Sequence, residues 1–194
     1  MTFSAAKWSD SPQRPAVTRQ QPFPETRLAA FDVDGVLTDG GLHYSGSGDF
    51  MKTFDVRDGM GIRMLMDSGI EVAIITSRQA PMVGLRAADL GIRHLRQGIH
   101  DKAGALTELL TELAIPPASA AFMGDDLVDL PAFLLCGFTA TVAGAPALLK
   151  RHARHVTRAT GGHGAVREFC ELLLHRRGML RARTRGFLGT AASG

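Results

Sequence analysis

The sequence has few cysteines, few aromatic residues and no long hydrophobic run, and these scarcities exclude several classes of protein. Only two cysteines are present, Cys136 and Cys170, and both stand in apolar surroundings typical of reduced core residues. No uninterrupted apolar run reaches about 18 residues, so we expect no membrane span. The N-terminus lacks the charged-then-apolar pattern of an export signal. We therefore expect a cytoplasmic protein with no membrane partner.

The positive charge is concentrated near the end of the chain. The net charge is +3, but from Lys150 onward there are ten Lys or Arg against two acidic residues, which leaves 12 basic and 17 acidic residues before that point. Such a basic segment suits nucleic acid, an anionic ligand or a solvated tail. Aromatic residues for base stacking are limited there to Phe169 and Phe187. We favour the last two possibilities and expect no nucleic-acid partner.

The composition and length predict one main domain. Of the 194 residues, 45% are hydrophobic and 21% are charged, as in ordinary globular proteins. Residues 1–25 mix Ser, Pro and Gln without an apolar period, so we expect a disordered extension there. The domain itself is expected over residues 26–180. Residues 181–194 are expected to form a basic, flexible tail.

Within this domain, short apolar runs alternate with amphipathic segments. The apolar runs predict strands at 28–33, 71–75, 92–95, 120–123, 138–142 and around 156. The segments between them predict helices from 58, at 81–90, from 101, around 129–135, near 145–152 and from 164. This alternation predicts an α/β fold, a Rossmann-like parallel sheet with helices on both faces. A Gly-rich tip at 45–49 between apolar flanks predicts a small β-hairpin flap.

Two carboxylates stand at the end of the first predicted strand. Asp32 and Asp34 are two residues apart, so their side chains point to the same side of an extended chain. Carboxylates placed together repel unless a cation lies between them, and oxygen ligands favour a hard ion, Mg²⁺ before Ca²⁺. Alternatively, Asp-x-Asp-Gly forms only a turn, because Asp and Gly dominate turns. The later part of the chain favours a site.

Further polar residues follow later strands. Thr76 follows the strand at 71–75, Asp125 and Asp126 follow the strand at 120–123, and Lys102 opens a helix between them. Because parallel strands end at a common edge, these side chains are expected to gather there. Acids, a hydroxyl and an ammonium suit phosphoryl transfer through an aspartate nucleophile. Each residue alone also fits a simpler role as a cap, a solvated lysine or a helix start.

A receiver domain of bacterial signalling is the main rival from another class. It also places an aspartate, a Thr or Ser, a Lys and an acidic pair on a parallel sheet. A receiver carries its acidic pair on the first strand and its Lys on the last. Here the pair Asp125-Asp126 follows Lys102. This order favours a hydrolase.

The chain resembles the haloacid dehalogenase superfamily of phosphatases at all four of its motifs. These motifs correspond to Asp32-Val33-Asp34-Gly35-Val36-Leu37-Thr38-Asp39-Gly40, Thr76, Lys102 and Gly124-Asp125-Asp126-x-x-Asp129. Residues 54–62, Asp101-Lys102 and residues 161–168 are further similar to the small capless branch of phosphatases that act on 3-deoxy-D-manno-octulosonate 8-phosphate. The resemblance covers about residues 28–180.

This resemblance implies a haloacid dehalogenase-like fold and an Mg²⁺-dependent phosphatase of lipopolysaccharide precursor biosynthesis. Asp32 would attack phosphorus to form an aspartyl-phosphate. Asp34 would act first as general acid and then as general base. Thr76 and Lys102 would bind the phosphoryl oxygens.

The same resemblance implies how the metal is held. Mg²⁺ would be bound by Asp32, Asp125 and the main-chain carbonyl of Asp34. Asp126 and Asp129 would stabilise the metal ligands and Lys102 without binding the metal directly.

The resemblance also implies a homotetramer, in which the hairpin joins subunits and a neighbour's C-terminal segment closes the site over the sugar acid. Arg57, Arg78 and Arg167 are expected to bind the carboxylate and phosphate of this small-molecule substrate.

One departure concerns the second motif, where the superfamily's usual Thr-Gly-Arg is Thr76-Ser77-Arg78. We expect Ser77 to strain a backbone shape that Gly takes freely, which would rearrange the phosphate loop and lower activity. Two other functions stay open. They are a phosphatase of a nine-carbon sugar acid 9-phosphate and a non-catalytic, phosphate-sensing regulator.

Overall fold

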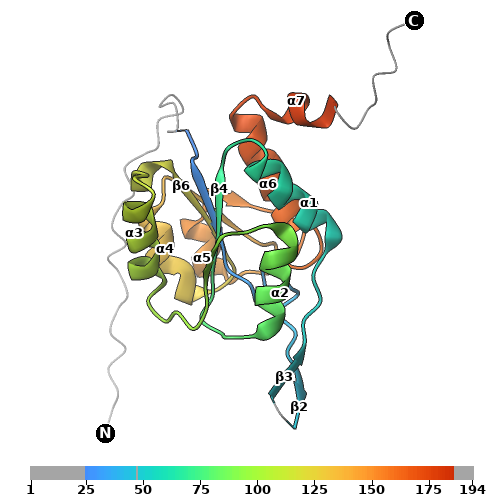
Figure 1. Cartoon of the computed structure of the whole chain (residues 1–194). Coiled ribbons are helices and arrows are strands. Elements are labelled where there is room, and N and C mark those ends of the chain that lie inside the picture. Colours follow the sequence, from blue (N-terminus) through green and yellow to red (C-terminus); the bar gives the residue numbers. More distant parts are fainter. Residues whose placement is uncertain (1–24, 47, 186–194) are drawn as a thin grey trace, which may run out of the picture.

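A six-stranded parallel sheet forms the centre of the protein. The structure, a computed structural model, describes residues 25–46 and 48–185. The strands lie in the order β5-β4-β1-β6-β7-β8 (Figure 1). They span, in chain order, β1 (Leu28–Phe31), β4 (Glu71–Ile75), β5 (His94–Arg96), β6 (Ala120–Gly124), β7 (Phe138–Thr141) and β8 (His155–Val156). All five strand pairings are parallel, which confirms the predicted fold class.

Helices cover both faces of this sheet, as predicted. In Figure 1, α1 (Val56–Met66), α2 (Pro81–Leu90) and α6 (Ala165–Arg176) lie on one side of the strands. On the other side are α3 (Lys102–Glu112), α4 (Leu130–Leu135) and α5 (Ala147–His152). Two short 3₁₀ turns, Pro117–Ser119 and Leu127–Asp129, flank β6. A strand covered on both faces needs apolar side chains on both, and every residue of β1 and β6 is buried.

Local signals fix the ends of the helices. The carboxylate of Asp101 accepts a hydrogen bond from the Gly104 amide at 2.9 Å and so begins α3. Gly91 ends α2 in the left-handed conformation, with φ of 80°. The amide of Ile92 then bonds back to the Ala87 carbonyl at 2.9 Å. Since this bond belongs to the helix end, β5 begins at His94, two residues later than the apolar pattern predicts.

Two aromatic clusters pack the two sides of the sheet. On one side, Phe169 of α6 meets Phe31 of β1 edge to face at 5.9 Å and stacks on Phe138 of β7 at 6.2 Å between ring centroids. On the other side, Phe122 of β6 meets Phe133 of α4 at 6.0 Å. Both cysteines are free, with Cys170 buried and Cys136 partly buried.

The strand order places a switch point between β1 and β6. From β1 the chain moves outward to β4 and β5, and it then returns to build β6, β7 and β8 on the other side of β1. Phe31 is in register with Ile74 and with Met123, so Asp32 follows at the level of Ile75 and Gly124. Ligands of open α/β sheets bind at such a point, outside the carboxyl ends of the strands.

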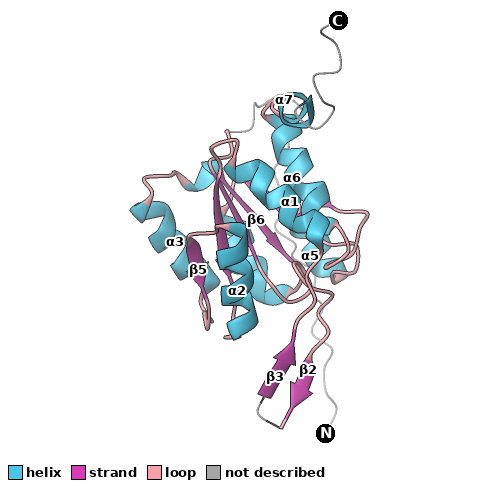
Figure 2. Ribbon diagram, turned by 45° about the vertical axis from the view of Figure 1, so that its right-hand side comes forward, coloured by secondary structure: helices cyan, strands magenta, loops and turns pink. Residues whose placement is uncertain are grey.

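The predicted hairpin is confirmed. Strands β2 (His43–Ser45) and β3 (Gly48–Met51) pair antiparallel in a separate two-stranded sheet. Figure 2 shows that this hairpin, which follows the loop after β1, projects from the end of the molecule opposite α7. The hairpin therefore stands beside the carboxyl edge of the main sheet.

The predicted limits of the domain are described only in part. Residues 1–24 and 186–194, which hold most of the expected extension and tail, lie outside the described residues. The first residues of the expected tail form a short helix, α7 (Leu180–Arg185). Arg183 of α7 donates a hydrogen bond to the Ser68 hydroxyl at 2.8 Å. The domain limits themselves stay predictions.

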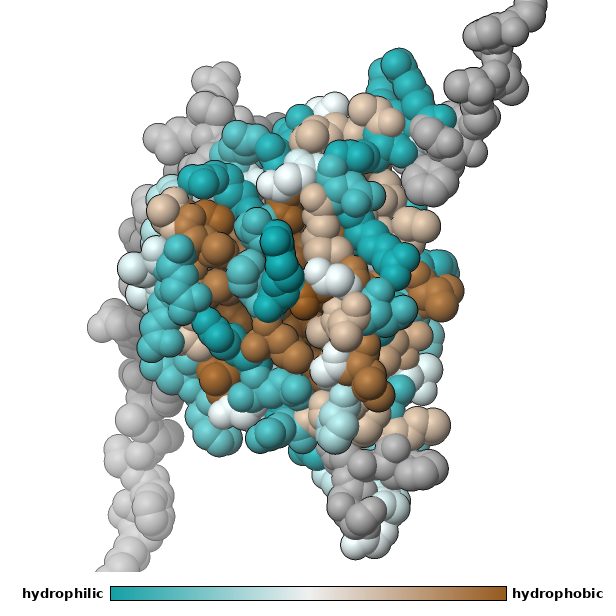
Figure 3. Space-filling model, in the orientation of Figure 1, coloured by the Kyte–Doolittle hydropathy of each residue, from teal (hydrophilic) through white to brown (hydrophobic). Residues whose placement is uncertain are grey.

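Figure 3 shows one face of the molecule in the orientation of Figure 1, where hydrophilic side chains cover much of the surface and hydrophobic ones show between α3 and α2. Over the described ranges, no helix combines the length and the apolar character that crossing a bilayer requires.

A buried aspartate on α1 caps the start of α6. Gly164 precedes α6 and has no side chain to cap it. Asp58 performs this role from α1, since its carboxylate accepts hydrogen bonds from the amides of Arg167 at 2.7 Å and Gly164 at 3.4 Å. The side chain is 1% exposed. Negative charge at a helix start is favourable, so Asp58 joins α1 to the segment that leads into α6.

We expect Asp58→Ala to lower the free energy of unfolding by about 2 kcal/mol, because the helix start loses its cap and buried amides lose their acceptor. Urea denaturation of the variant and of wild type measures this difference. Asp67→Ala is the matched control, because Asp67 is an exposed residue at the end of α1, and its effect should stay within about 0.5 kcal/mol. Equal losses in the two variants would contradict the capping role.

Candidate active site

A buried lysine links two carboxylates at the carboxyl edge of the sheet. Lys102, the first residue of α3, places its Nζ 2.8 Å from Oδ2 of Asp32 and 2.6 Å from Oδ1 of Asp129. All three residues are buried, with exposed fractions of 2%, 6% and 0%. Charges this far from water are stable only in close pairs, so the lysine and the two acids form one unit.

Asp129 also organises the loop that follows β6. Its Oδ2 accepts hydrogen bonds from the main-chain amides of Asp125 at 2.9 Å and Asp126 at 3.2 Å. Carboxylate oxygens of Asp32, Asp125 and Asp129 lie within 4.8 Å of one another. The fourth sequence motif is therefore a turn held by its own last aspartate, and this turn directs Asp125 toward Asp32.

Burial and mutual repulsion perturb the acids of this cluster. Burial, with the charge of Asp129, raises the pKa of Asp32 to about 6, although Lys102 opposes the shift. Burial and the charges of Asp32 and Asp129 raise the pKa of Asp125 to about 7. Burial works against the charge of Lys102, but the carboxylates outweigh it and raise the lysine pKa. One ammonium therefore leaves the three acids with excess negative charge.

The residues present fit a divalent cation at this position. Oδ1 of Asp32 is buried and has no hydrogen-bond partner among the described residues. A buried polar atom without a partner is costly, and a cation beside it would supply the missing interaction. The available ligands are oxygens, from the cluster of Asp32, Asp125 and Asp129. Oxygen donors favour a hard ion of the Mg²⁺ or Ca²⁺ type.

Asp34 lies between two basic side chains. Its Oδ1 pairs with the ammonium of Lys52, and its Oδ2 lies 3.7 Å from Nε of Arg78. Arg78 also donates a hydrogen bond to the Tyr44 hydroxyl at 3.2 Å. Tyr44 belongs to β2 and Lys52 follows β3 directly. The hairpin thus reaches the candidate site through two side chains.

Thr76 is buried at the end of β4, at the same edge of the sheet. Its hydroxyl accepts a long hydrogen bond of 3.4 Å from the amide of Arg78. The expected backbone strain at Ser77 is not found. Among the described residues, Ala114 is the one non-glycine residue with positive φ, so Ser77 adopts a conformation open to any residue. The prediction of strain was therefore wrong, while a rearranged phosphate loop and lower activity stay predictions.

The remaining predicted residues lie outside this cluster. The side chain of Asp126 is exposed and caps the 3₁₀ turn through the Leu127 amide at 2.7 Å. Arg57 is exposed and pairs with Asp55. Arg167 pairs with Glu171, with 2.6 Å between Nε and Oε1. The single chain therefore gives the Arg57 and Arg167 guanidinium groups to other carboxylates, and their role in substrate binding stays a prediction.

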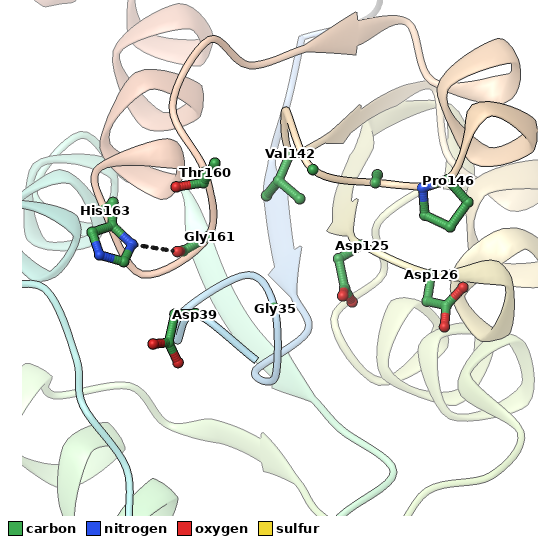
Figure 4. A pocket seen from close by; sticks show the side chains of 11 residues that line it. Gly35, Asp39, Asp125, Asp126, Val142, Pro146, Thr160, Gly161 and His163 are labelled. Atoms are coloured by element: carbon green, nitrogen blue, oxygen red, sulfur yellow. Dashed lines mark hydrogen bonds between the residues drawn. The ribbon is translucent and has the colours of Figure 1, made fainter. Parts of the chain in front are cut away.

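A cavity of about 340 Å³ opens beside Asp125. Figure 4 shows Asp125 and Asp39 on opposite sides of Gly35, and the segment from Thr160 to His163 forms another wall of the cavity. His163 donates a hydrogen bond to the carbonyl of Gly161 at 2.9 Å, drawn as the dashed line. Of the three clustered acids, Asp125 lines this cavity, beside the segments that follow β7 and β8.

Glycines allow the loop after β1 to pack closely against neighbouring segments. Gly35 has φ of 82°, and a Cβ built there would overlap the Asp125 carboxylate. A Cβ at Gly161 would overlap the Gly35 carbonyl, and the Gly162 amide donates to the Val36 carbonyl at 3.0 Å. Residues 161–162 thus hold the loop after β1 from a distant part of the chain.

Sequence reasoning missed the role of several residues near the site. Lys52 follows the apolar pair Phe50-Met51, and a lone lysine at that position was the available signal. Tyr44 is the sole tyrosine of the chain, and this was a weaker signal. Nothing local marked Gly35 and Gly161 as contact points, because their partners are far away in sequence.

Comparisons with known proteins agree with this geometry. Residues 93–169 match the haloacid dehalogenase-like hydrolase family. The 3-deoxy-D-manno-octulosonate 8-phosphate phosphatase KdsC of Escherichia coli K12 is 51% identical over 154 residues, which are 79% of this chain and 82% of that protein. The same phosphatase from Haemophilus influenzae is 43% identical over 82% of this chain and 88% of its own length.

Solved structures give the same result. The cobalt-bound phosphatase of Haemophilus influenzae has a TM-score of 0.83 at 42% identity, over 87% of this chain and 100% of that one. The enzyme of Moraxella catarrhalis, in complex with magnesium, phosphate and a KDO molecule, has a TM-score of 0.82 at 42% identity, over 84% and 94%. The chain therefore belongs to the 3-deoxy-D-manno-octulosonate 8-phosphate phosphatase family, within the haloacid dehalogenase-like hydrolases.

Proposed function

We propose that this protein hydrolyses 3-deoxy-D-manno-octulosonate 8-phosphate to the free sugar acid and phosphate. The observation that carries the proposal is the Asp32 carboxylate, which Lys102 fixes at one oxygen while the other is buried without a partner. A carboxylate held in this way is an ordered nucleophile: the cation would take the unpartnered oxygen, and the oxygen beside Lys102 would attack phosphorus. The family relationship supplies the substrate, and we place the reaction in the cytoplasmic synthesis of a lipopolysaccharide precursor.

The proposed reaction has two steps that use the same residues. Asp32 attacks phosphorus, the ester P–O bond breaks, and the leaving alcohol takes a proton from Asp34. Water then gives a proton back to Asp34 and attacks the aspartyl-phosphate, which releases phosphate and restores Asp32. Proton transfer of this kind accounts for about 10²–10⁴-fold in rate. Thr76 and Lys102 are proposed to bind the phosphoryl oxygens.

We propose Mg²⁺ as the cofactor. It would be held by Asp32, Asp125 and the main-chain carbonyl of Asp34, with Asp129 behind them. When bound, it would neutralise charge on the phosphoryl oxygens. Support comes from the oxygen-only cluster of this chain and from the magnesium ion in the Moraxella catarrhalis complex. The same complex contains KDO, which supports a sugar acid as product.

We also propose a homotetramer in which the hairpin contacts other subunits. The hairpin and its flanks carry exposed hydrophobic side chains, with exposed fractions of 42% at Leu42, 63% at Tyr44 and 44% at Met51. Exposed apolar residues gathered on one small element favour an interface. Arg57, Arg78 and Arg167 are proposed to bind the anionic groups of the substrate in this assembly.

The first prediction concerns the substrate. Among a panel of phosphorylated sugars, we expect phosphate release to be fastest from 3-deoxy-D-manno-octulosonate 8-phosphate and to stop on addition of EDTA. Restored turnover after excess Mg²⁺ is the control for chelator damage. Faster hydrolysis of a nine-carbon sugar acid 9-phosphate would replace the proposed substrate. Phosphate binding without turnover of any substrate would favour the regulator.

The second prediction concerns the nucleophile. Asp32→Asn is expected to lower kcat on the order of 10⁴-fold or more, as loss of a covalent nucleophile does in other enzymes. Asp67→Asn, a change of the same kind at an exposed position on α1, serves as the control and should leave kcat within about twofold of wild type. Full turnover by the Asp32 variant would show that another group attacks phosphorus.

The third prediction concerns the close contact that directs Asp125. Gly35→Ala should raise the Mg²⁺ concentration needed for half-maximal activity by about 10- to 100-fold, because the new Cβ overlaps the Asp125 carboxylate. Gly69→Ala is a matched control, since Gly69 has a similar φ of 74° and nothing within 4 Å of the added atom. A Mg²⁺ titration of both variants checks this, and equal shifts would reject the contact as the cause.

A further inference from the structure

The hairpin holds a lysine whose side chain is turned inward against Asp34. Lys52 directly follows β3, and its side chain is 2% exposed. Its ammonium pairs with Oδ1 of Asp34. The neighbouring residues Met51 and Thr53 are exposed. The strand end therefore buries a charged side chain and exposes an apolar one, which is the reverse of the usual preference.

Burial of the Lys52 ammonium carries an energetic cost. Taking an ammonium out of water costs several kcal/mol, and a pair with one carboxylate recovers this cost only with good geometry. Asp34 is itself 21% exposed and lies in the loop after β1, outside the regular strand. A buried lysine fixed on a half-exposed carboxylate restrains the direction of that carboxylate.

A second contact from the hairpin acts on the same residue. Arg78 approaches Oδ2 of Asp34 at 3.7 Å, and its guanidinium donates to the Tyr44 hydroxyl at 3.2 Å. The guanidinium also lies over the Tyr44 ring, 6.0 Å from its centroid. Both oxygens of Asp34 thus face a cation, and one of these cations comes from the hairpin while the other is supported by it.

We propose that Lys52 is a positioning residue that aligns Asp34 for proton transfer. The proposal rests on the proposed function, in which Asp34 gives a proton to the leaving alcohol and takes one from water. Such transfer requires a heavy-atom separation of about 2.6–3.2 Å. The Lys52 ammonium fixes Oδ1 and so sets the direction of the carboxylate. Lys52 acts through Asp34 and does not contact the reacting atoms.

A purely structural ion pair would have different consequences. Loss of such an ion pair would lower the stability of the fold and would raise KM as well as change kcat. These effects would appear whether or not Asp34 takes part in the reaction. A positioning role predicts instead a loss in kcat that depends on the Asp34 carboxylate. A double-mutant cycle separates the two, because residues that act as one unit give non-additive losses.

The experiment compares Lys52→Met, Asp34→Asn and the double variant with wild type, using 3-deoxy-D-manno-octulosonate 8-phosphate and saturating Mg²⁺. We expect Lys52→Met to lower kcat by about 10- to 100-fold with KM within about twofold, the range found when a partner orienting a functional group is lost. In the Asp34→Asn background, the same change should cost less than about threefold. Lys52→Arg, which keeps the charge, should lie closer to wild type than Lys52→Met.

Lys150→Met is the matched control, since Lys150 lies in the last turn of α5, and its kcat should equal that of wild type. Should Lys52→Met fail to fold by thermal unfolding, Lys52→Gln replaces it in the same cycle. The proposal is overturned if Lys52→Met keeps kcat within twofold of wild type, or if it raises KM alone. It is also overturned if the losses of the two single variants multiply in the double variant. Absence of turnover in wild type would instead reject the proposed function.

Discussion

The buried ion pairs of Lys102 are the interaction on which the site depends. One ammonium contacts Asp32 and Asp129 within 2.8 Å, and all three side chains are almost fully enclosed. Removing one partner of such a buried unit costs about 3–5 kcal/mol, because the others are left with uncompensated charge. Lys102 therefore has a structural role besides the proposed contact with substrate, since it connects Asp32 at the end of β1, the start of α3 and the loop after β6.

The positive charge of Lys102 does not balance the carboxylates around it. Asp32, Asp125 and Asp129 bring three carboxylates to a place where Lys102 supplies one positive charge, and burial raises the pKa of Asp32 to about 6 and of Asp125 to about 7. A protein without need of a cation would gain stability by replacing one of these acids. The retained excess of negative charge explains why the site suits a divalent cation.

Much of this could be predicted from the sequence, because the relevant residues follow strands. Asp32, Thr76 and Asp125 were found from the rule that parallel strands end at one edge. Lys102 was found from its place at a helix start. The alternation of apolar runs and amphipathic segments gave the sheet and the two helical layers, and the Gly-rich tip gave the hairpin. These inferences need only local pattern and the direction of the strands.

What escaped prediction depends on contacts between distant segments. The clamp of Gly161 on the Gly35 carbonyl and the cap of Asp58 on α6 join residues more than 100 positions apart. No local pattern marks such pairs. The expected strain at Ser77 failed for a related reason, since a motif comparison predicts residue types and not the φ angle that the loop adopts.

The hairpin shows how an accessory element can enter the chemistry of a site built by the sheet. The sheet fixes Asp32, Thr76 and Lys102 through strand ends and a helix start, but it leaves Asp34 in a loop with part of its surface exposed. A loop aspartate with rotational freedom is a poor proton donor, because transfer requires one direction. The hairpin returns to this point with Lys52, so the element that was predicted as a flap also carries a restraint for the second aspartate of the motif. If Lys52 has the proposed positioning role, sequence changes in the hairpin will alter turnover without touching Asp32.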